Sequence, residues 1–130
     1  MNLYAADTHA LVWYLSDDKQ LSRKVRAIFD NLHNSQDHIF IPTIVLAEVM
    51  VIAEKSRASV KYDEVVNFLS NNNRCTIMPL TIEIVETARQ ITGASELFDR
   101  LIAATAIYLD AKLITRDAVL ARLKNVETVW

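Results

Sequence analysis

The chain has 130 residues, of which 52% are apolar and 23% are charged, so its composition is that of one globular domain and not that of a disordered segment. The formal net charge of −2 excludes a globally basic nucleic-acid-binding protein, and any contact with nucleic acid must depend on local basic side chains. The single cysteine, Cys75, argues against a secreted disulfide scaffold and favours the reducing cytoplasm.

Several common kinds of site are excluded by the residues that the sequence lacks. Gly93 is the only glycine, which excludes the glycine-rich phosphate loop and the dinucleotide fingerprint. The sequence has neither a cysteine pair nor a His-Glu-x-x-His run, so zinc sites of those patterns are excluded as well. We expect no signal peptide and no membrane span, because no apolar run reaches about 18 residues.

The first half of the chain alternates short apolar runs with segments of helical character. The first run ends at Asp7, and Ser22 is a favourable N-cap for a segment with apolar residues at helical spacing. Pro42 ends the second run and suits the first turn of the helix that follows. In order, we expect strand 3–6, helix 8–15, a helix from Ser22 to about residue 34, strand 38–41, a helix from Pro42 to about residue 57, and helix 62–70.

The second half continues the same alternation. Pro79 closes the third apolar run, and Thr81 caps a helix that we expect to stop at Gly93, because glycine takes the left-handed C-terminal conformation most readily. In order, we expect strand 76–78, helix 81–93, helix 98–109, strand 113–115, helix 117–123 and strand 126–129. Five short strands that alternate with helices predict an α/β fold, with a parallel sheet covered by helices on both faces.

Four acidic residues, Asp7, Glu48, Asp99 and Asp117, stand in apolar surroundings or at the junctions of these elements. Glu48 is the clearest case, since residues 44–53 surround it with apolar side chains on every side of a helix. A carboxylate there is costly unless it is paired or bound to a cation. Asp7 and Asp117 follow expected strands and Asp99 begins a helix, so we expect the carboxyl edge of the sheet to bring the four together.

Each carboxylate also has a purely structural interpretation. Asp7 and Asp117 suit the N-cap of the helix that follows, and Asp99 suits a first helical turn or a pair with Arg100. Glu48 suits a buried pair with an arginine. We favour a common site, since one shared cause is simpler than four separate ones. Carboxylate ligands then indicate a hard divalent cation, Mg²⁺ or Mn²⁺.

Four short motifs contain the acidic residues. They read DTHALVW at residues 7–13, IPTIVLAE at 41–48, FDRLIAATA at 98–106 and LITRD at 113–117. Together they resemble the motifs of the PIN-domain ribonucleases, in particular the VapC-type toxins of prokaryotic toxin–antitoxin pairs, over essentially the whole chain. Many relatives have Asp-Pro where Glu96-Leu97 stands, and Ser or Trp in the second motif where this chain has Thr43 and Ala47. All four acidic positions are kept.

The resemblance implies one PIN domain over residues 1–130, a three-layer sandwich with a five-stranded parallel sheet in the order 3-2-1-4-5. It implies that Asp7, Glu48, Asp99 and Asp117 are catalytic and bind Mg²⁺ or Mn²⁺ directly or through water. The implied reaction is hydrolysis of RNA to products with 5′-phosphate and 3′-hydroxyl ends. The implied partners are a cognate antitoxin that blocks the pocket and a second copy of the chain in a homodimer.

An acidic pocket repels RNA, so neighbouring side chains must position the substrate. The candidates beside the motifs are Thr8, Arg100, Thr115 and Arg116. The threonines also suit caps or packing, and Arg100 also suits a pair with an acidic neighbour. We expect Trp13, Tyr14 and Phe98 to pack in the core or at a dimer contact and not to stack on bases.

Other classes of protein fit less well. A haloacid-dehalogenase phosphatase needs a second aspartate two residues after the first, where His9 stands. A receiver domain needs adjacent acidic residues near the end of the first strand and a lysine on the last strand, and neither is present. The remaining alternative is a catalytically silent PIN-like binding or regulatory module, which the four intact acidic positions disfavour.

Overall fold

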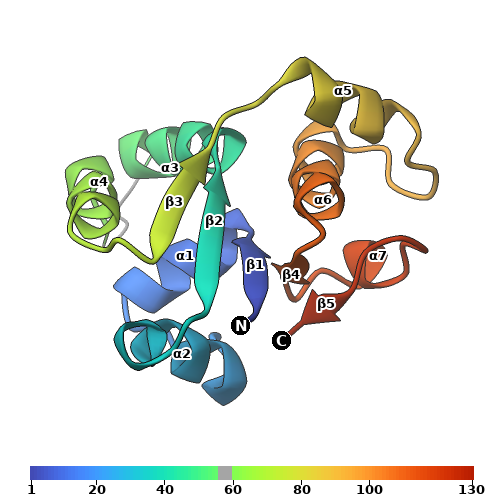
Figure 1. The fold of residues 1–130 in the computed structure, drawn as a ribbon. Helices are drawn as coiled ribbons and strands as arrows, with labels where there is room; N and C mark the ends of the chain where they lie inside the picture. Colours follow the sequence, from blue (N-terminus) through green and yellow to red (C-terminus); the bar gives the residue numbers. More distant parts are fainter. Residues whose placement is uncertain (56–59) are drawn as a thin grey trace.

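The computed structural model describes residues 1–55 and 60–130, and Figure 1 shows a central sheet flanked by helices. The expected alternation of strands and helices is present. In chain order, the elements are β1 (Leu3–Ala6), α1 (Thr8–Leu15), α2 (Arg23–Asp30), the 3-10 helix η1 (Leu32–Asn34), β2 (His38–Pro42), α3 (Thr43–Glu54), α4 (Tyr62–Ser70), β3 (Cys75–Met78), α5 (Ile82–Arg89), α6 (Leu97–Leu109), β4 (Lys112–Ile114), α7 (Ala118–Ala121) and β5 (Thr128–Val129).

The five strands form one parallel sheet in the order β3-β2-β1-β4-β5. Consecutive residues on a strand point to opposite faces of a sheet. Ala5 and Ala6 on β1, and Leu113 and Ile114 on β4, are all fully buried, so both faces of the sheet are covered. The predicted α/β sandwich and its strand order are therefore confirmed.

The topology places the carboxyl ends of β1 and β4 side by side. The chain moves outward from β1 through β2 to β3 and then returns to the other side of β1 to form β4. Ala6 is paired with Ile114, and the backbone N–H of Asp7 donates to the carbonyl of Ile114 at 3.1 Å. Segments that follow the two strands are thus adjacent at the point where the strand order reverses, which is the usual place for a site in this kind of fold.

The end of α5 differs from the prediction. The helix ends at Arg89 and not at Gly93, which lies beyond it in a turn with φ of +94°. The backbone closes the last turn, because the N–H groups of Gln90 and Ile91 donate three residues back, to the carbonyls of Thr87 and Ala88, at 3.1 Å each. Arg100 Nη2 also donates to the Ala88 carbonyl, at 2.7 Å. Helix α3 is described as far as Glu54, so the expected end near residue 57 lies outside the described residues.

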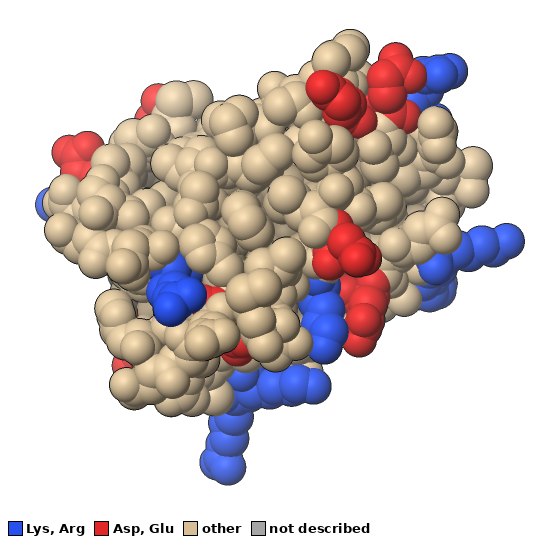
Figure 2. All heavy atoms as spheres, in the orientation of Figure 1, with Lys and Arg blue, Asp and Glu red and all other residues tan. Residues whose placement is uncertain are grey.

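The surface carries charges of both signs. On the face shown in Figure 2, acidic and basic side chains are interspersed around a mostly uncharged surface, which agrees with the net charge of −2. No helix in the described part of the chain combines the length and the apolar character that crossing a bilayer requires.

Candidate functional site

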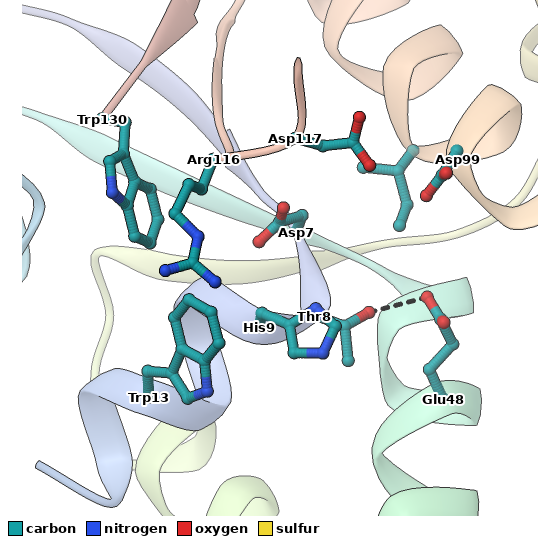
Figure 3. Close-up of a pocket in the computed structure, with 10 residues that line it drawn as sticks. Asp7, Thr8, His9, Trp13, Glu48, Asp99, Arg116, Asp117 and Trp130 are labelled. Carbon is teal, nitrogen blue, oxygen red and sulfur yellow. Dashed lines mark hydrogen bonds between the residues drawn. The ribbon is translucent and has the colours of Figure 1, made fainter. Parts of the chain in front are cut away.

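The four predicted acidic side chains line one open pocket of about 350 Å³ (Figure 3). Asp7 is the N-cap of α1 directly after β1, and Asp117 is the N-cap of α7 after β4. Glu48 lies on α3, and Asp99 lies in the first turn of α6. Elements that are far apart in the sequence therefore bring the four carboxylates into the same space.

Asp7 is held from two sides. Its Oδ1 accepts from the backbone N–H of Ala10 at 2.9 Å, and its Oδ2 accepts from the hydroxyl of Thr115. Burial raises the pKa of Asp7, and the two hydrogen bonds oppose that rise because they favour the charged form. The Thr115 oxygen also accepts from the backbone N–H of Asp117 at 3.1 Å. One buried hydroxyl thus links two of the four acidic residues.

Glu48 is fixed by a second threonine. The hydroxyl of Thr8, which is 4% exposed, donates to Glu48 Oε1 at 2.7 Å (Figure 3). Burial raises the pKa of Glu48, and the Thr8 bond lowers it. No salt bridge to Glu48 is present among the described residues, so the structure does not support the alternative of a buried Glu–Arg pair.

Asp99 carries the largest resolved pKa shift in the pocket. Burial, followed by the nearby carboxylates of Glu96, Asp117, Glu48 and Asp7, raises its pKa from 3.8 to about 6. No hydrogen bond among the described contacts is accepted by its side chain, whereas Asp117 Oδ1 accepts from the backbone N–H groups of α7. Repulsion between the carboxylates of the site, added to burial, therefore raises the pKa of Asp99 with no hydrogen bond to its side chain to oppose the rise.

The four residues predicted to contact the substrate make different contacts in the structure. Thr8 and Thr115 are buried, and their hydroxyl protons go to Glu48 and Asp7, so they orient acidic side chains. Arg100 is not among the pocket-lining residues and points to α5 instead. Arg116 does line the pocket.

The donor set fits a hard divalent cation. Its charged atoms are carboxylate oxygens, and a bound cation offsets both the burial and the repulsion that raise the pKa values of the site. Across the described residues, no group of three or more His, Cys, Asp and Glu side chains is arranged to hold a metal ion directly. Magnesium keeps several waters and takes only one or two carboxylates in many sites, so the pocket suits an ion that is held partly through water.

One wall of the pocket was not predicted from the sequence. Trp13, which we expected in the core or at a dimer contact, lines the pocket together with His9, Arg116 and Trp130. Figure 3 shows the two indoles on the same side of the pocket as Arg116, away from Asp99 and Glu48. Trp130 follows β5, and no local signal in the sequence places a residue there beside the first helix.

Solved structures with the same fold include toxin–antitoxin assemblies. VapBC2 from Rickettsia felis, bound to a DNA fragment from its promoter, matches with a TM-score of 0.77 and 22% identity over 98% of both chains. DNA-bound VapBC from Salmonella typhimurium matches with a TM-score of 0.73 and 18% identity, covering 99% of this chain and 98% of that chain. A toxin–antitoxin complex from Klebsiella pneumoniae matches with a TM-score of 0.66 and 25% identity, covering 100% of this chain and 97% of that chain.

The sequence itself identifies the family. No curated protein matches it at a significant level. It does match the PIN domain over residues 4–126, which includes all four acidic positions and nearly the whole chain. The chain therefore belongs to the PIN domain family.

Proposed function

We propose that the protein is an endoribonuclease that hydrolyses RNA phosphodiester bonds with Mg²⁺ or Mn²⁺, and that it is the toxin of a type II toxin–antitoxin pair. The observation that carries the proposal is the convergence of Asp7, Glu48, Asp99 and Asp117 in one open pocket. Membership of the PIN domain family supports nuclease chemistry, because PIN domains are generally nucleases.

The residues of the pocket have different roles in the proposed reaction. A divalent cation supplies an activated water and neutralises charge on the phosphoryl oxygens when it is bound. The four carboxylates bind the cation directly or through water, and one of them orients the attacking water. Thr8 and Thr115 keep Glu48 and Asp7 in fixed orientations, which limits the rearrangement needed for catalysis.

The reaction is tested by RNA cleavage with added magnesium or manganese. We expect Asp7→Asn and Glu48→Gln each to lower the cleavage rate by about a hundredfold or more, because each removes a charged ligand of the proposed cation. Asp63→Asn is the matched control, since Asp63 is an exposed acidic residue on α4 that does not line the pocket. Equal cleavage by the wild type and both pocket variants would contradict the mechanism.

The toxin role depends on a partner. Similar structures include VapBC assemblies and the toxin–antitoxin complex from Klebsiella pneumoniae, which supports an antitoxin as the partner of this chain. The cheapest observation is genomic: we expect a small open reading frame directly beside the gene. Its absence would count against the toxin role and would leave the nuclease proposal untouched.

A catalytically silent PIN module is the second candidate. It is favoured by one observation, that the described side chains do not form a ready group of three direct metal ligands. Titration calorimetry with Mn²⁺ at neutral pH distinguishes the two candidates. Heat of binding that is lost in Asp7→Asn supports the nuclease, and no binding by the wild-type protein supports the silent module.

A further inference from the structure

The wall of the pocket away from Asp99 and Glu48 contains an arginine stacked on a tryptophan (Figure 3). The Arg116 Cζ atom lies 4.6 Å from the centroid of the Trp13 ring, which is the geometry of a cation–π contact. The Trp13 ring is itself braced, by an edge contact to Trp130 at 5.9 Å and by the His9 ring at 5.1 Å between centroids. Three rings from two ends of the chain thus define the position of one guanidinium.

The stack leaves the charge and most of the donors of Arg116 available. A guanidinium that lies on a ring uses its face, while its N–H groups point outward in the plane. The described hydrogen bond of the side chain is from Nη2 to Gln20 Oε1 at 3.2 Å, and no described carboxylate forms an ion pair with it. Among the described residues that line the pocket, Arg116 is the one lysine or arginine.

We propose that Trp13 is a positioning residue that holds Arg116 so that its guanidinium binds an RNA phosphate next to the one that is cleaved. This inference rests on the proposed function, because it names how that site holds RNA against four negative side chains. A planar guanidinium matches a phosphate with two parallel hydrogen bonds. The stack orders the side chain before RNA arrives, so less conformational freedom is lost on binding.

The contacts favour this role of Trp13 over direct stacking of a base on its ring. The guanidinium lies over the indole of Trp13, and the rings of Trp130 and His9 also contact this indole, the first by its edge and the second in a tilted arrangement. If Trp13 acts through Arg116, removal of either side chain must lower the affinity for RNA in the same way, and removal of both must lower it no further. If Trp13 binds a base by itself, the two losses of affinity must be independent.

The test measures binding of a mixed-sequence single-stranded RNA of about 20 nucleotides in an Asp7→Asn background with magnesium, at several salt concentrations. We expect Arg116→Gln to weaken binding about tenfold, as for loss of a charged hydrogen bond, and to reduce the salt slope by about 0.7, as for loss of one phosphate contact. Trp13→Leu should weaken binding in the same direction, and the double variant should lose no more than Arg116→Gln alone.

Two conservative variants distinguish the positioning of the Arg116 guanidinium from the effect of its charge and from simple packing of the Trp13 side chain. Arg116→Lys keeps the charge but loses the planar fork, so we expect RNA binding weaker than that of the wild type and tighter than that of Arg116→Gln, with the salt slope of the wild type. Trp13→Phe keeps an aromatic face and should restore most of the binding lost in Trp13→Leu. In the cleaving enzyme, Arg116→Lys and Trp13→Leu should raise KM and leave kcat nearly unchanged. Arg89→Gln is the matched control, because Arg89 lies on α5 and does not line the pocket.

The possible failures are distinguishable. The inference would be overturned if the losses of RNA affinity in the two single variants added up in the double variant, or if Arg116→Lys bound RNA as tightly as the wild type. RNA cleavage by the active enzyme would still uphold the proposed function in that case. If the active enzyme cleaved no RNA and the Asp7→Asn protein bound none, the proposed function would fail and the inference would fail with it. If Trp13→Leu does not fold, Arg116→Lys still decides whether the planar guanidinium is needed, and Trp13→Phe combined with Arg116→Gln tests the coupling to Trp13.

Discussion

At the scale of single residues, Asp99 differs from its three acidic neighbours in the pocket. Asp7 and Asp117 accept hydrogen bonds from backbone N–H groups, and Glu48 accepts one from the side-chain hydroxyl of Thr8. The described contacts give the Asp99 side chain no donor of either kind. Burial therefore acts on Asp99 with little compensation, and the surrounding carboxylates add to the effect. The result is a pKa of about 6, which lies close to neutral pH.

This shift predicts how stability depends on pH in the absence of metal. The folded protein holds the Asp99 proton more tightly than the unfolded chain, so the contribution of Asp99 to the free energy of unfolding is fully present below its ordinary pKa of 3.8 and is lost as the pH rises through about 6. We expect urea denaturation in excess EDTA to show a steeper fall between these pH values for the wild type than for Asp99→Asn.

The comparison of the wild type with Asp99→Asn reports the proton of Asp99 together with its coupling to the neighbouring carboxylates, since all other titrating groups are present in both proteins. Added Mg²⁺ should restore stability to the wild type near neutral pH, because a bound cation stabilises the ionised carboxylates. Parallel stability curves for the wild type and Asp99→Asn would show that the Asp99 proton is not linked to folding.

At the scale of elements, the start of α6 depends on Glu96. Its two carboxylate oxygens accept from the backbone N–H groups of Phe98 at 3.2 Å and Asp99 at 2.8 Å, so Glu96 is the N-cap of the helix that carries Asp99. The family resemblance implies Asp-Pro at this place, whereas the Glu96 side chain provides the cap in this chain. The departure from the family motif therefore has a structural role at the edge of the pocket.

We expect Glu96→Ala to lower the free energy of unfolding by about 1 kcal/mol, the usual effect of losing an N-cap acceptor. Glu96→Asp should retain most of the stability, because aspartate is a good N-cap and keeps the charge at the helix N-terminus. Chemical denaturation at pH 5 is the suitable measurement, since repulsion between the residue 96 side chain and a partly protonated Asp99 is smaller there. Equal stability of Glu96→Ala and the wild type would contradict the capping role.

At the scale of the whole molecule, large apolar side chains are exposed on α3, on the segment from β3 into α5, and on α6, and both α3 and α5 pack against α6. The set is Met50, Val51, Leu80, Ile82, Val85 and Leu97. Ile82 is 68% exposed and Leu97 is 60% exposed, which is high for side chains of this type. Together with the apolar character of these helices, this exposure supports the homodimer implied by the family resemblance.

We expect sedimentation velocity to show a dimer at micromolar concentration and Ile82→Glu to shift it toward the monomer, because the new charge must be desolvated in an apolar contact. Val119→Glu is a suitable control, since Val119 is exposed at 45% on α7, outside this set. A wild-type protein that sediments as a monomer would contradict the proposed self-association.

Much of the fold and the acidic half of the site could be predicted from sequence because both depend on local patterns. Alternating apolar runs, the caps at Ser22 and Thr81, and the proline after the second strand define the elements. The four acidic residues are visible in the sequence since each stands where charge is unusual or where an element begins. The meeting of Asp7 and Asp117 follows from parallel strands, whose carboxyl ends share one edge of the sheet, whereas Glu48 and Asp99 reach the pocket from α3 and α6.

Contacts between side chains from distant elements were decided only by the tertiary structure. Nothing local distinguishes Arg100, which satisfies the end of α5, from Arg116, which stacks on Trp13 and faces the pocket. The same holds for the hydroxyl of Thr115, which follows β4 and reaches Asp7 at the end of β1. The physical reason is that local propensity selects each helix and strand, whereas the partner of a long side chain depends on which elements the topology packs beside it.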